Sequence, residues 1–275
     1  MKKIVSLLLC LLICLSSLTF AEDTWTCPNC GKENTKNFCT SCGTPRPENT
    51  GFSGTPFTEP VSAASYKVGD TVTFGSWGDE PVEWQILERK EDGTYVMISV
   101  MGLDAKAYNE DWEAATWETC SLRAWLNGEF YETAFTAEER AKIRLSTVEN
   151  EDNQTHGTSG GNATKDYVYL LSVEEADRYY RITGTYGGES AALICMPTKT
   201  AIRNECWEVS QDWIRTNQWN YGYTLKAGAC WWWLRTPGES EYTATYVGYD
   251  GNVGVNGLYN FYTDACVRPV ICVNL

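Results

Sequence analysis

The sequence predicts an α+β domain that follows a small cysteine-rich unit at the N-terminus. Strand-like alternation of apolar and polar residues occurs near both ends of residues 66–275, and short helix signals lie between them. Two Cys-x-x-Cys pairs precede this region. A stretch rich in Pro, Gly, Ser and Thr separates the pairs from the α+β region, which indicates two bodies joined by a linker.

The first residues have the composition of a secretory signal peptide. Lys2 and Lys3 precede an apolar run over residues 4–15, and Ala21 stands before an acidic mature start. The apolar run is shorter than the roughly 20 residues that span a bilayer. We therefore expect residues 1–21 to be cleaved and the mature protein to be secreted or held at the cell surface, with no stable membrane span. An uncleaved anchor is the alternative.

Residues 22–46 contain two cysteine knuckles, each followed by glycine, formed by Cys27, Cys30, Cys39 and Cys42. The spacing resembles a zinc ribbon, in which four thiolates bind one structural Zn²⁺ ion tetrahedrally. Glycine after each knuckle lets backbone N–H groups approach the sulfur atoms. Because export leads into an oxidising space, a pair of disulfides is the alternative. Residues 47–65 form the predicted linker.

The α+β region begins and ends with predicted strands. Residues 71–74, 82–87 and 94–99 alternate as strands do, and a turn at residues 90–93 joins the last two. The chain returns to strands at residues 244–247 and 267–273, with an Asp250-Gly251 turn after the first of these. We expect the strands from the two ends of the region to meet in one sheet.

Short helices are predicted between these strands. A helix that begins at Ser121 is expected to end at Asn127-Gly128, which suits a left-handed exit. Capping boxes that begin at Thr136 and Ser172 predict two further helix starts. Residues 167–171 form a strand that leads into the second of these helices.

A series of motifs runs along this region in the order Trp84-Gln-Ile-Leu87, Cys120-Ser-Leu-Arg-Ala-Trp-Leu-Asn127, Asp166-Tyr-Val-Tyr-Leu-Leu-Ser172, Cys195-Met-Pro-Thr198, Trp232-Trp-Leu-Arg-Thr-Pro-Gly238 and Val267-Arg-Pro-Val270. The series resembles a bacterial domain family of unknown function. That family is assigned a C-type-lectin-like fold, distantly akin to the formylglycine-generating (sulfatase-modifying) enzymes. The resemblance covers about residues 66–275 and implies this fold. It implies no particular activity, because one fold hosts many kinds of site.

The charge of the chain argues against a nucleic-acid partner. The formal net charge is −14, and removal of Lys2 and Lys3 with the signal peptide moves it to −16. Such a surface repels nucleic acid and anionic membranes, and no cluster of Lys or Arg offsets it.

Few residues are arranged for catalysis. His156 is the only histidine, and it lies in a polar, glycine-rich stretch where an imidazole would be exposed and loosely held. Carboxylates are plentiful, but their spacing does not distinguish them from solvated charges. The calcium-site tripeptides of true lectins are absent from the sequence. We therefore expect a protein without catalytic activity. A degenerate formylglycine-generating-like enzyme, a carboxylate-based hydrolase and a structural cell-surface module are the alternatives.

Six further cysteines are scattered through the domain: Cys120, Cys195, Cys206, Cys230, Cys266 and Cys272. Disulfides and buried thiols both remain open for them, because six cysteines allow many pairings. Cys266 and Cys272 are the only late candidates for a reactive pair of the kind that the formylglycine-generating relatives use. Their spacing would place them about 20 Å apart on one face of a strand, which favours core packing.

Aromatic residues near the C-terminus are the strongest sign of function. The three tryptophans 231–233 are expected to be mostly core residues, with the outer two on the face opposite the middle one. Beyond them, Tyr and Asn interleave with glycines, as in antibody binding loops. We expect loops near residues 218–262 to bind an extracellular protein or glycan. The expected contact residues are Tyr246, Tyr249, Asp250, Asn252, Asn256, Tyr259, Asn260 and Tyr262. A tight glycine-rich turn region without a ligand is the alternative.

Overall fold

The computed structural model describes residues 24–28, 30–35, 66–182, 188–217 and 225–275. The chain divides into two compact units, Met1–Ala63 and Ala64–Leu275. The expected signal peptide, the expected linker, Cys39 and Cys42 lie outside the described residues. In the described ranges, no helix combines the length and apolar character that crossing a membrane requires.

In the first unit, a short hairpin carries the first cysteine pair. Strands β1 (Trp25–Thr26) and β2 (Glu33–Asn34) pair antiparallel. Between them, the backbone N–H of Gly31 donates to the carbonyl of Cys27 at 2.9 Å. Gly31 has a φ of +71°, which glycine adopts without strain. Cys27 is buried and Cys30 is exposed at this turn.

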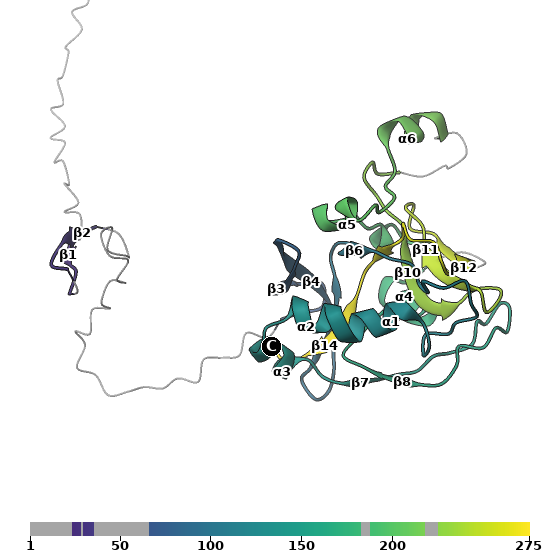
Figure 1. Cartoon of the computed structure of the whole chain (residues 1–275), viewed down its shortest axis with the longest axis horizontal. Helices are drawn as coiled ribbons and strands as arrows, with labels where there is room; N and C mark the ends of the chain where they lie inside the picture. The colour runs from purple at the N-terminus through teal and green to yellow at the C-terminus, as the bar shows by residue number, and fades with distance from the viewer. Residues whose placement is uncertain (1–23, 29, 36–65, 183–187, 218–224) are drawn as a thin grey trace, which may run out of the picture. The chain divides into compact units, whose positions relative to one another are not determined.

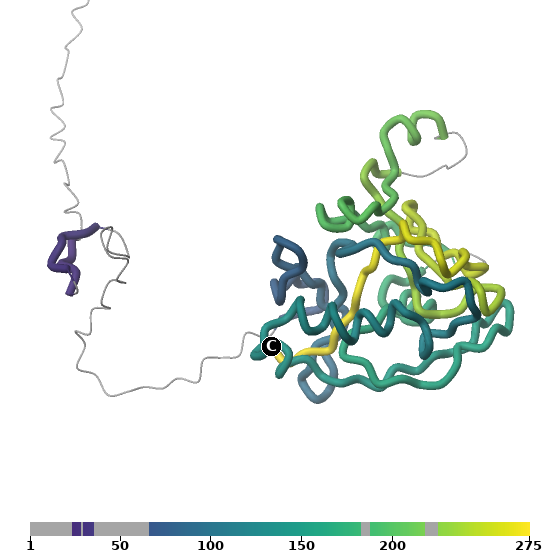
Figure 2. Tube along the Cα trace, viewed as in Figure 1, coloured from purple at the N-terminus to yellow at the C-terminus, as the bar shows by residue number. Residues whose placement is uncertain are grey.

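Five antiparallel strands form the first sheet of the second unit. Their spatial order is β3 (Thr71–Trp77), β4 (Glu80–Arg89), β5 (Tyr95–Ser99), β14 (Val270–Val273) and β9 (Val168–Tyr169). The C-terminal strand β14 thus lies between β5 and β9, with Ile271 opposite both Met97 and Val168. The strands from the two ends of the domain meet in one sheet, as the sequence predicts. In Figure 2 the last segment can be followed in yellow to the C-terminus.

The second sheet carries the long C-terminal hairpin. Its spatial order is β12 (Val253–Tyr259), β11 (Thr243–Val247), β10 (Trp232–Pro237), β13 (Cys266–Val267) and β6 (Asp104–Ala105). Strands β10 and β13 are parallel, and the other neighbours are antiparallel. The turn between β11 and β12 contains Gly251 with a φ of +83°, which matches the predicted Asp250-Gly251 turn. Figure 1 shows β10, β11 and β12 side by side.

Helices and a small hairpin connect the two sheets (Figure 1). The helices are α1 (Ser121–Trp125), the π-helix η1 (Leu126–Phe130), α2 (Tyr131–Ala134), α3 (Ala137–Lys142), α4 (Val173–Tyr180), the 3₁₀-helix η2 (Ala191–Leu193), α5 (Lys199–Arg203) and α6 (Gln211–Asn217). The hairpin pairs β7 (Ser146–Val148) with β8 (Thr164–Asp166). Thr136 and Ser172 form the predicted capping boxes, in which each side chain accepts from the backbone N–H three residues later. The second unit therefore has α+β architecture.

The predicted helix end at Asn127-Gly128 is wrong. The helix continues through η1 into α2, and Gly128 does not adopt a positive φ. The Asn127 side chain instead bridges the helix to the sheet, because its amide donates to the carbonyl of Val168 at 2.8 Å and accepts from the N–H of Tyr167 at 2.7 Å. These bonds hold Asn127 against the segment that enters β9. The helix widens here into the π-helical turn η1 and continues into α2.

Four tryptophans fill the core, and each of their indole N–H groups has a hydrogen-bond acceptor. Trp84, Trp117, Trp232 and Trp233 are fully buried. Three of them donate to backbone carbonyls, those of Phe74, Leu193 and Lys106, at 2.7–3.1 Å. Buried tryptophans thereby contribute large apolar areas without an unpaired donor.

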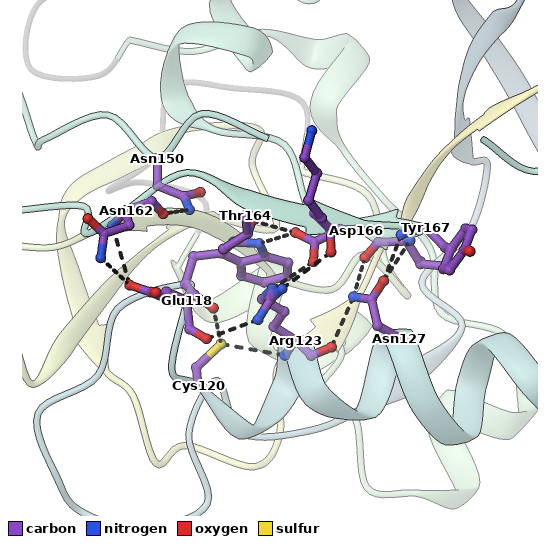
Figure 3. Close-up of polar contacts among 12 residues, drawn as sticks. Glu118, Cys120, Arg123, Asn127, Asn150, Asn162, Thr164, Asp166 and Tyr167 are labelled. Atoms are coloured by element: carbon purple, nitrogen blue, oxygen red, sulfur yellow. Dashed lines mark hydrogen bonds and ion pairs between the residues drawn. The ribbon is translucent and has the colours of Figure 1, made fainter. Parts of the chain in front are cut away.

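The fourth tryptophan belongs to a polar network beneath α1. Asp166 is fully buried and accepts from Trp117 at 3.0 Å, from Thr164 at 2.6 Å and from Arg123 Nε at 2.7 Å. Arg123 also donates to the carbonyl of Glu118 at 3.0 Å. Figure 3 shows Arg123 reaching from the helix to Asp166. The motif arginine therefore connects α1 to β8.

Candidate ligand-binding site

An open aromatic pocket of about 340 Å³ lies at one end of the second sheet. Its wall residues come from strands β11 and β12, from the segments next to strands β10 to β13, and from the segment after α5. They are Trp207, Trp231, Tyr246, Gly248, Tyr249, Leu258, Tyr262 and Asp264. We call this hollow the aromatic pocket.

Strand register sets one wall of the aromatic pocket. Trp233 in β10 lies opposite Tyr246 in β11. Trp231 precedes Trp233 by two positions, so the two tryptophan side chains point to the same face of the sheet. The Trp231 and Tyr246 rings meet edge to face, with centroids 5.8 Å apart. All three tryptophans 231–233 are buried, and Trp231 packs against Trp233 at 4.9 Å. The predicted alternation of the three rings is therefore correct, and Trp231 has an additional place in the pocket wall.

A glycine on the neighbouring strand makes room for Tyr246. Gly254 in β12 lies directly opposite Tyr246. A Cβ atom at Gly254 would lie 2.3 Å from the Tyr246 ring. The ring can therefore lie against the β12 backbone only because residue 254 has no side chain.

The opposite wall is formed by rings from two segments distant in sequence. Trp207 and Tyr249 have centroids 5.3 Å apart, and Trp213 of α6 packs edge to face on Tyr249 at 5.0 Å. Trp207 is fixed by a backbone hydrogen bond from its N–H to the carbonyl of Asp264 at 3.0 Å. This bond holds the two sides of the pocket together.

Asp264 is the one acidic side chain among the described residues that line the aromatic pocket. Burial, and to a lesser degree the proximity of Cys206, raise the pKa of its carboxyl above the ordinary value. The pocket thus offers aromatic faces and a single partly desolvated carboxyl group.

Comparison with known protein families places this pocket in a recognised domain. Residues 92–275 match the model of a domain of unknown function, DUF6273. The chain belongs to the DUF6273 family. No curated protein and no solved structure matches the chain. The expected resemblance to a family of unknown function is confirmed at this level.

The DUF6273 match covers every residue that lines the aromatic pocket. Strands β3 and β4 precede the matched region, yet β4 pairs with β5 along most of its length. The folded unit of this DUF6273 protein therefore begins before the matched segment.

The structure divides the eight expected contact residues between several environments. Tyr246, Tyr249 and Tyr262 line the aromatic pocket. Asn252 and Asn256 line a second hollow of about 390 Å³, in which Tyr246 and His156 also take part. The His156 Nε2 atom lies 2.9 Å from Asn256 Oδ1, so the exposed imidazole has a partner across this hollow.

Three expected contact residues lie outside both hollows. The Asp250 carboxylate accepts from the N–H of Asn252 at 3.1 Å and thereby closes the turn. Tyr259 is exposed and stacks on Phe261 with centroids 5.6 Å apart. Asn260 is buried and donates to the carbonyl of Glu113 at 2.9 Å, so its side chain supports the loop from inside. Residues 218–224, also expected to contribute, lie outside the described residues.

Sequence reasoning did not find Trp207, Leu258 and Asp264. Trp207 follows the expected helices without a periodic pattern, and Asp264 resembles any solvated acid. The sequence nevertheless contains a signal for Trp207 and Asp264, because each of them lies within two positions of a cysteine.

A third hollow, a polar pocket of about 440 Å³, lies beside α4 in the DUF6273 domain. It is lined by several carboxylates, including Glu151 and Glu174. Burial and then the Glu174 charge raise the pKa of Glu151. Arg235 is buried here and forms an ion pair with Glu175, which is also the capping-box residue of α4. The Arg235–Glu175 pair thus has a structural role, whereas Glu151 is the carboxyl group of this pocket whose pKa is raised.

Cys266 and Cys272 do not form a pair. Cys266 lies in β13 of the second sheet, and Cys272 lies in β14 of the first, where its thiol contacts Thr94 Oγ1 at 3.5 Å. The two residues therefore lie on strands of different sheets, and the expectation that they share one face of a single strand is wrong.

Proposed function

We propose that the protein is an exported recognition protein that binds an extracellular glycan or protein ligand and catalyses no reaction. The observation that carries this proposal is the aromatic pocket, whose ring faces surround one partly buried carboxyl group. Stiff aromatic side chains supply contact area at low cost in conformational entropy. A concave, mostly apolar hollow with few polar groups is typical of ligand sites.

The lining defines the kind of group that fits. Aromatic faces suit the apolar face of a sugar ring, or an aromatic or aliphatic side chain of a protein. Asp264 accepts a hydrogen bond from a hydroxyl or an ammonium group. An anionic group is disfavoured, because the chain carries a formal charge of −14 and Asp264 faces the pocket.

The C-type-lectin-like fold and the distant kinship with formylglycine-generating enzymes belong to the same proposal. Two features support the fold. The last strand, β14, pairs with β5 in the sheet begun by β3, β4 and β5, and the strands and connections of the second sheet line the pocket. A rigid sheet with functional loops suits a recognition domain.

A zinc ribbon, formed by Cys27, Cys30, Cys39 and Cys42, is proposed for the N-terminal unit. The hairpin of β1 and β2 supports it, because Cys27 and Cys30 lie on a tight turn that Gly31 closes. A Zn²⁺ ion held there would have a structural role. The signal peptide predicted at residues 1–21 is the basis for proposing secretion or display at the cell surface.

A matched pair of tyrosines tests the pocket. Tyr262 lines it and is 38% exposed, whereas Tyr242 does not line it and is 39% exposed. The full chain is screened on a glycan array and on an array of bacterial surface proteins. The best binder is then titrated against each variant. We expect Tyr262→Ala to weaken binding at least tenfold, as for a central aromatic anchor, and Tyr242→Ala to leave it unchanged.

Equal effects of the two substitutions would contradict the pocket as the binding site. A chain that binds nothing on either array and shows no turnover would favour the structural cell-surface module.

A carboxylate-based hydrolase is the second candidate, and the raised pKa of Glu151 beside Glu174 is the observation that favours it. A general acid needs a pKa above the ordinary carboxyl value. The test is a panel of glycosides incubated with the full chain and with Glu151→Gln. Turnover that Glu151→Gln abolishes would replace the recognition proposal with a hydrolase.

A further inference from the structure

Three buried cysteines bring their sulfur atoms together behind the aromatic pocket. The Sγ atoms of Cys206, Cys230 and Cys266 all lie within 4.8 Å of one another. The exposed fractions of these residues are 7%, 0% and 0%. A fourth cysteine, Cys195, is 1% exposed, and its thiol shares a hydrogen bond with Cys230. We call these four residues the cysteine cluster.

Four separate segments of backbone converge on the cysteine cluster. Cys195 and Cys230 face each other across an antiparallel bridge, in which the Cys230 N–H donates to the Cys195 carbonyl at 2.9 Å. Cys206 follows α5, and its N–H donates to the carbonyl of Ala201 at 2.9 Å. Cys266 begins β13, and its N–H donates to the carbonyl of Trp231 at 2.9 Å. The backbone therefore holds all four side chains in place before any bond joins them.

A glycine lies against the sulfur atoms. A Cβ atom at Gly102 would lie 2.5 Å from Cys266 Sγ and 3.6 Å from Cys230 Sγ. The Gly102 backbone also hydrogen-bonds the Cys195 thiol. Backbone N–H groups close to sulfur are what a thiolate site requires, because they compensate its negative charge.

We propose that Cys195, Cys206, Cys230 and Cys266 bind one structural Zn²⁺ ion through four thiolates. Zn–S bonds of about 2.3 Å in a tetrahedron separate neighbouring sulfur atoms by about 3.8 Å. The sulfur atoms of Cys206, Cys230 and Cys266 already lie within 4.8 Å of one another, and the Cys206–Cys266 pair, 2.8 Å apart without the ion, would open to this spacing around it. Cys195 would be the fourth ligand, through its contact with Cys230. Four protein ligands leave no open position, and the low exposure of all four cysteines fits a closed structural site. Binding exchanges four S–H protons for one Zn²⁺ ion and involves no oxidation.

The proposed zinc ion would fix the walls of the aromatic pocket. Trp207 follows Cys206, Trp231 follows Cys230, and Asp264 precedes Cys266 by two residues. The backbone bonds from Trp207 to Asp264 and from Cys266 to Trp231 connect the same segments. Only this consequence rests on the proposed function. The metal site itself stands on the cysteine geometry.

The competing chemistry is a pair of disulfides, Cys195–Cys230 and Cys206–Cys266. Their formation would remove four protons and two electron pairs from the chain, and would need an oxidant such as the one that an exported protein meets. Zinc binding and disulfide formation therefore differ in metal content and in mass.

The test measures zinc in the full chain, in a Cys27→Ser/Cys30→Ser background that removes the N-terminal cysteine pair. We expect one zinc per chain by elemental analysis and by native mass spectrometry. In the same background, Cys230→Ser and Cys195→Ser should each lower the zinc content well below one per chain. The matched control is Cys272→Ser, a buried strand cysteine outside the cluster, which should retain one zinc.

A second measurement keeps the cluster intact in case the serine variants do not fold. Exchange of Zn²⁺ for Co²⁺ should give the charge-transfer absorption of thiolate-bound tetrahedral cobalt. A metal-free chain whose denatured mass is four hydrogens below that of the reduced chain would overturn the proposal in favour of two disulfides. Full zinc content in Cys230→Ser or Cys195→Ser, or cobalt without the charge-transfer bands, would also overturn it.

Discussion

Asp166 shows how one buried side chain can hold several elements together. Its carboxylate accepts from Trp117, Thr164 and Arg123, and it is fully buried. A buried charge is tolerated only where hydrogen bonds and an opposite charge replace the lost water. The motif that contains Arg123 is visible in the sequence, but its pairing with Asp166 is not, because 43 residues separate the two.

We expect Asp166→Ala to lower the free energy of unfolding by about 3–5 kcal/mol, because it leaves the Arg123 charge and two further donors without their acceptor. The control is Asp212→Ala, which removes a pair between Asp212 and Arg215 whose side chains are 83% and 77% exposed. Exposed pairs contribute about 1 kcal/mol or less. Urea denaturation of both variants gives the comparison, and a similar loss in both would contradict the assigned role of Asp166.

Gly254 is a second residue with a testable role, and that role is steric. Because its Cβ would lie 2.3 Å from the Tyr246 ring, Gly254→Ala should displace that ring and destabilise the protein by about 1–3 kcal/mol through overpacking. Combination with Tyr246→Ala should recover part of this loss, since the clash then disappears. A double-mutant cycle on unfolding free energies measures the coupling, and additive effects would show that the ring moves at no cost.

At the scale of elements, local signals were the most reliable guide. The capping boxes at Thr136 and Ser172 and the turn at Gly251 depend on neighbours within a few residues, and the structure contains all three. The end of the helix after Ser121 was predicted wrongly, because Asn127 hydrogen-bonds to Val168 in a strand 41 residues away. The cysteine cluster and the Trp207–Asp264 wall were missed for the same reason. Their members are far apart in the sequence and come together only in the folded domain.

The helix pair α1 and η1 yields a prediction for Trp125. The Trp125 ring packs against Trp77 of β3 at 5.4 Å and against Phe130 at 5.3 Å. We expect Trp125→Ala to cost about 3 kcal/mol, the lower part of the range for a core aromatic, because this ring is only partly buried. Trp125→Phe should cost less, since it keeps the ring contacts.

Thermal unfolding of the two Trp125 variants, with ligand titration beside it, checks the assignment. Neither variant should change the affinity of the folded protein, because Trp125 does not line the aromatic pocket. A soluble Trp125→Ala protein with the melting temperature of the wild type would contradict a structural role.

At the scale of the whole molecule, two separate sets of cysteines are expected to bind metal for different purposes. The N-terminal pair lies on a hairpin within the unit Met1–Ala63, which is too small to form a large apolar core. The cysteine cluster lies inside the unit Ala64–Leu275, which already has an extensive core. Zinc would therefore supply most of the folding free energy of the first unit, but only fix one region of the second.

This difference predicts separate responses to the loss of each metal site. Cys27→Ser/Cys30→Ser should leave the main calorimetric transition and the ligand affinity unchanged, because that transition belongs to the second unit. Cys230→Ser should lower the melting temperature of that transition and weaken ligand binding together, since the cluster residues adjoin Trp207, Trp231 and Asp264. Differential scanning calorimetry and ligand titration on the full chain measure both effects. A shift of the main transition by the N-terminal substitutions would mean that the two units stabilise each other, and the linker predicted from composition would then not keep them independent.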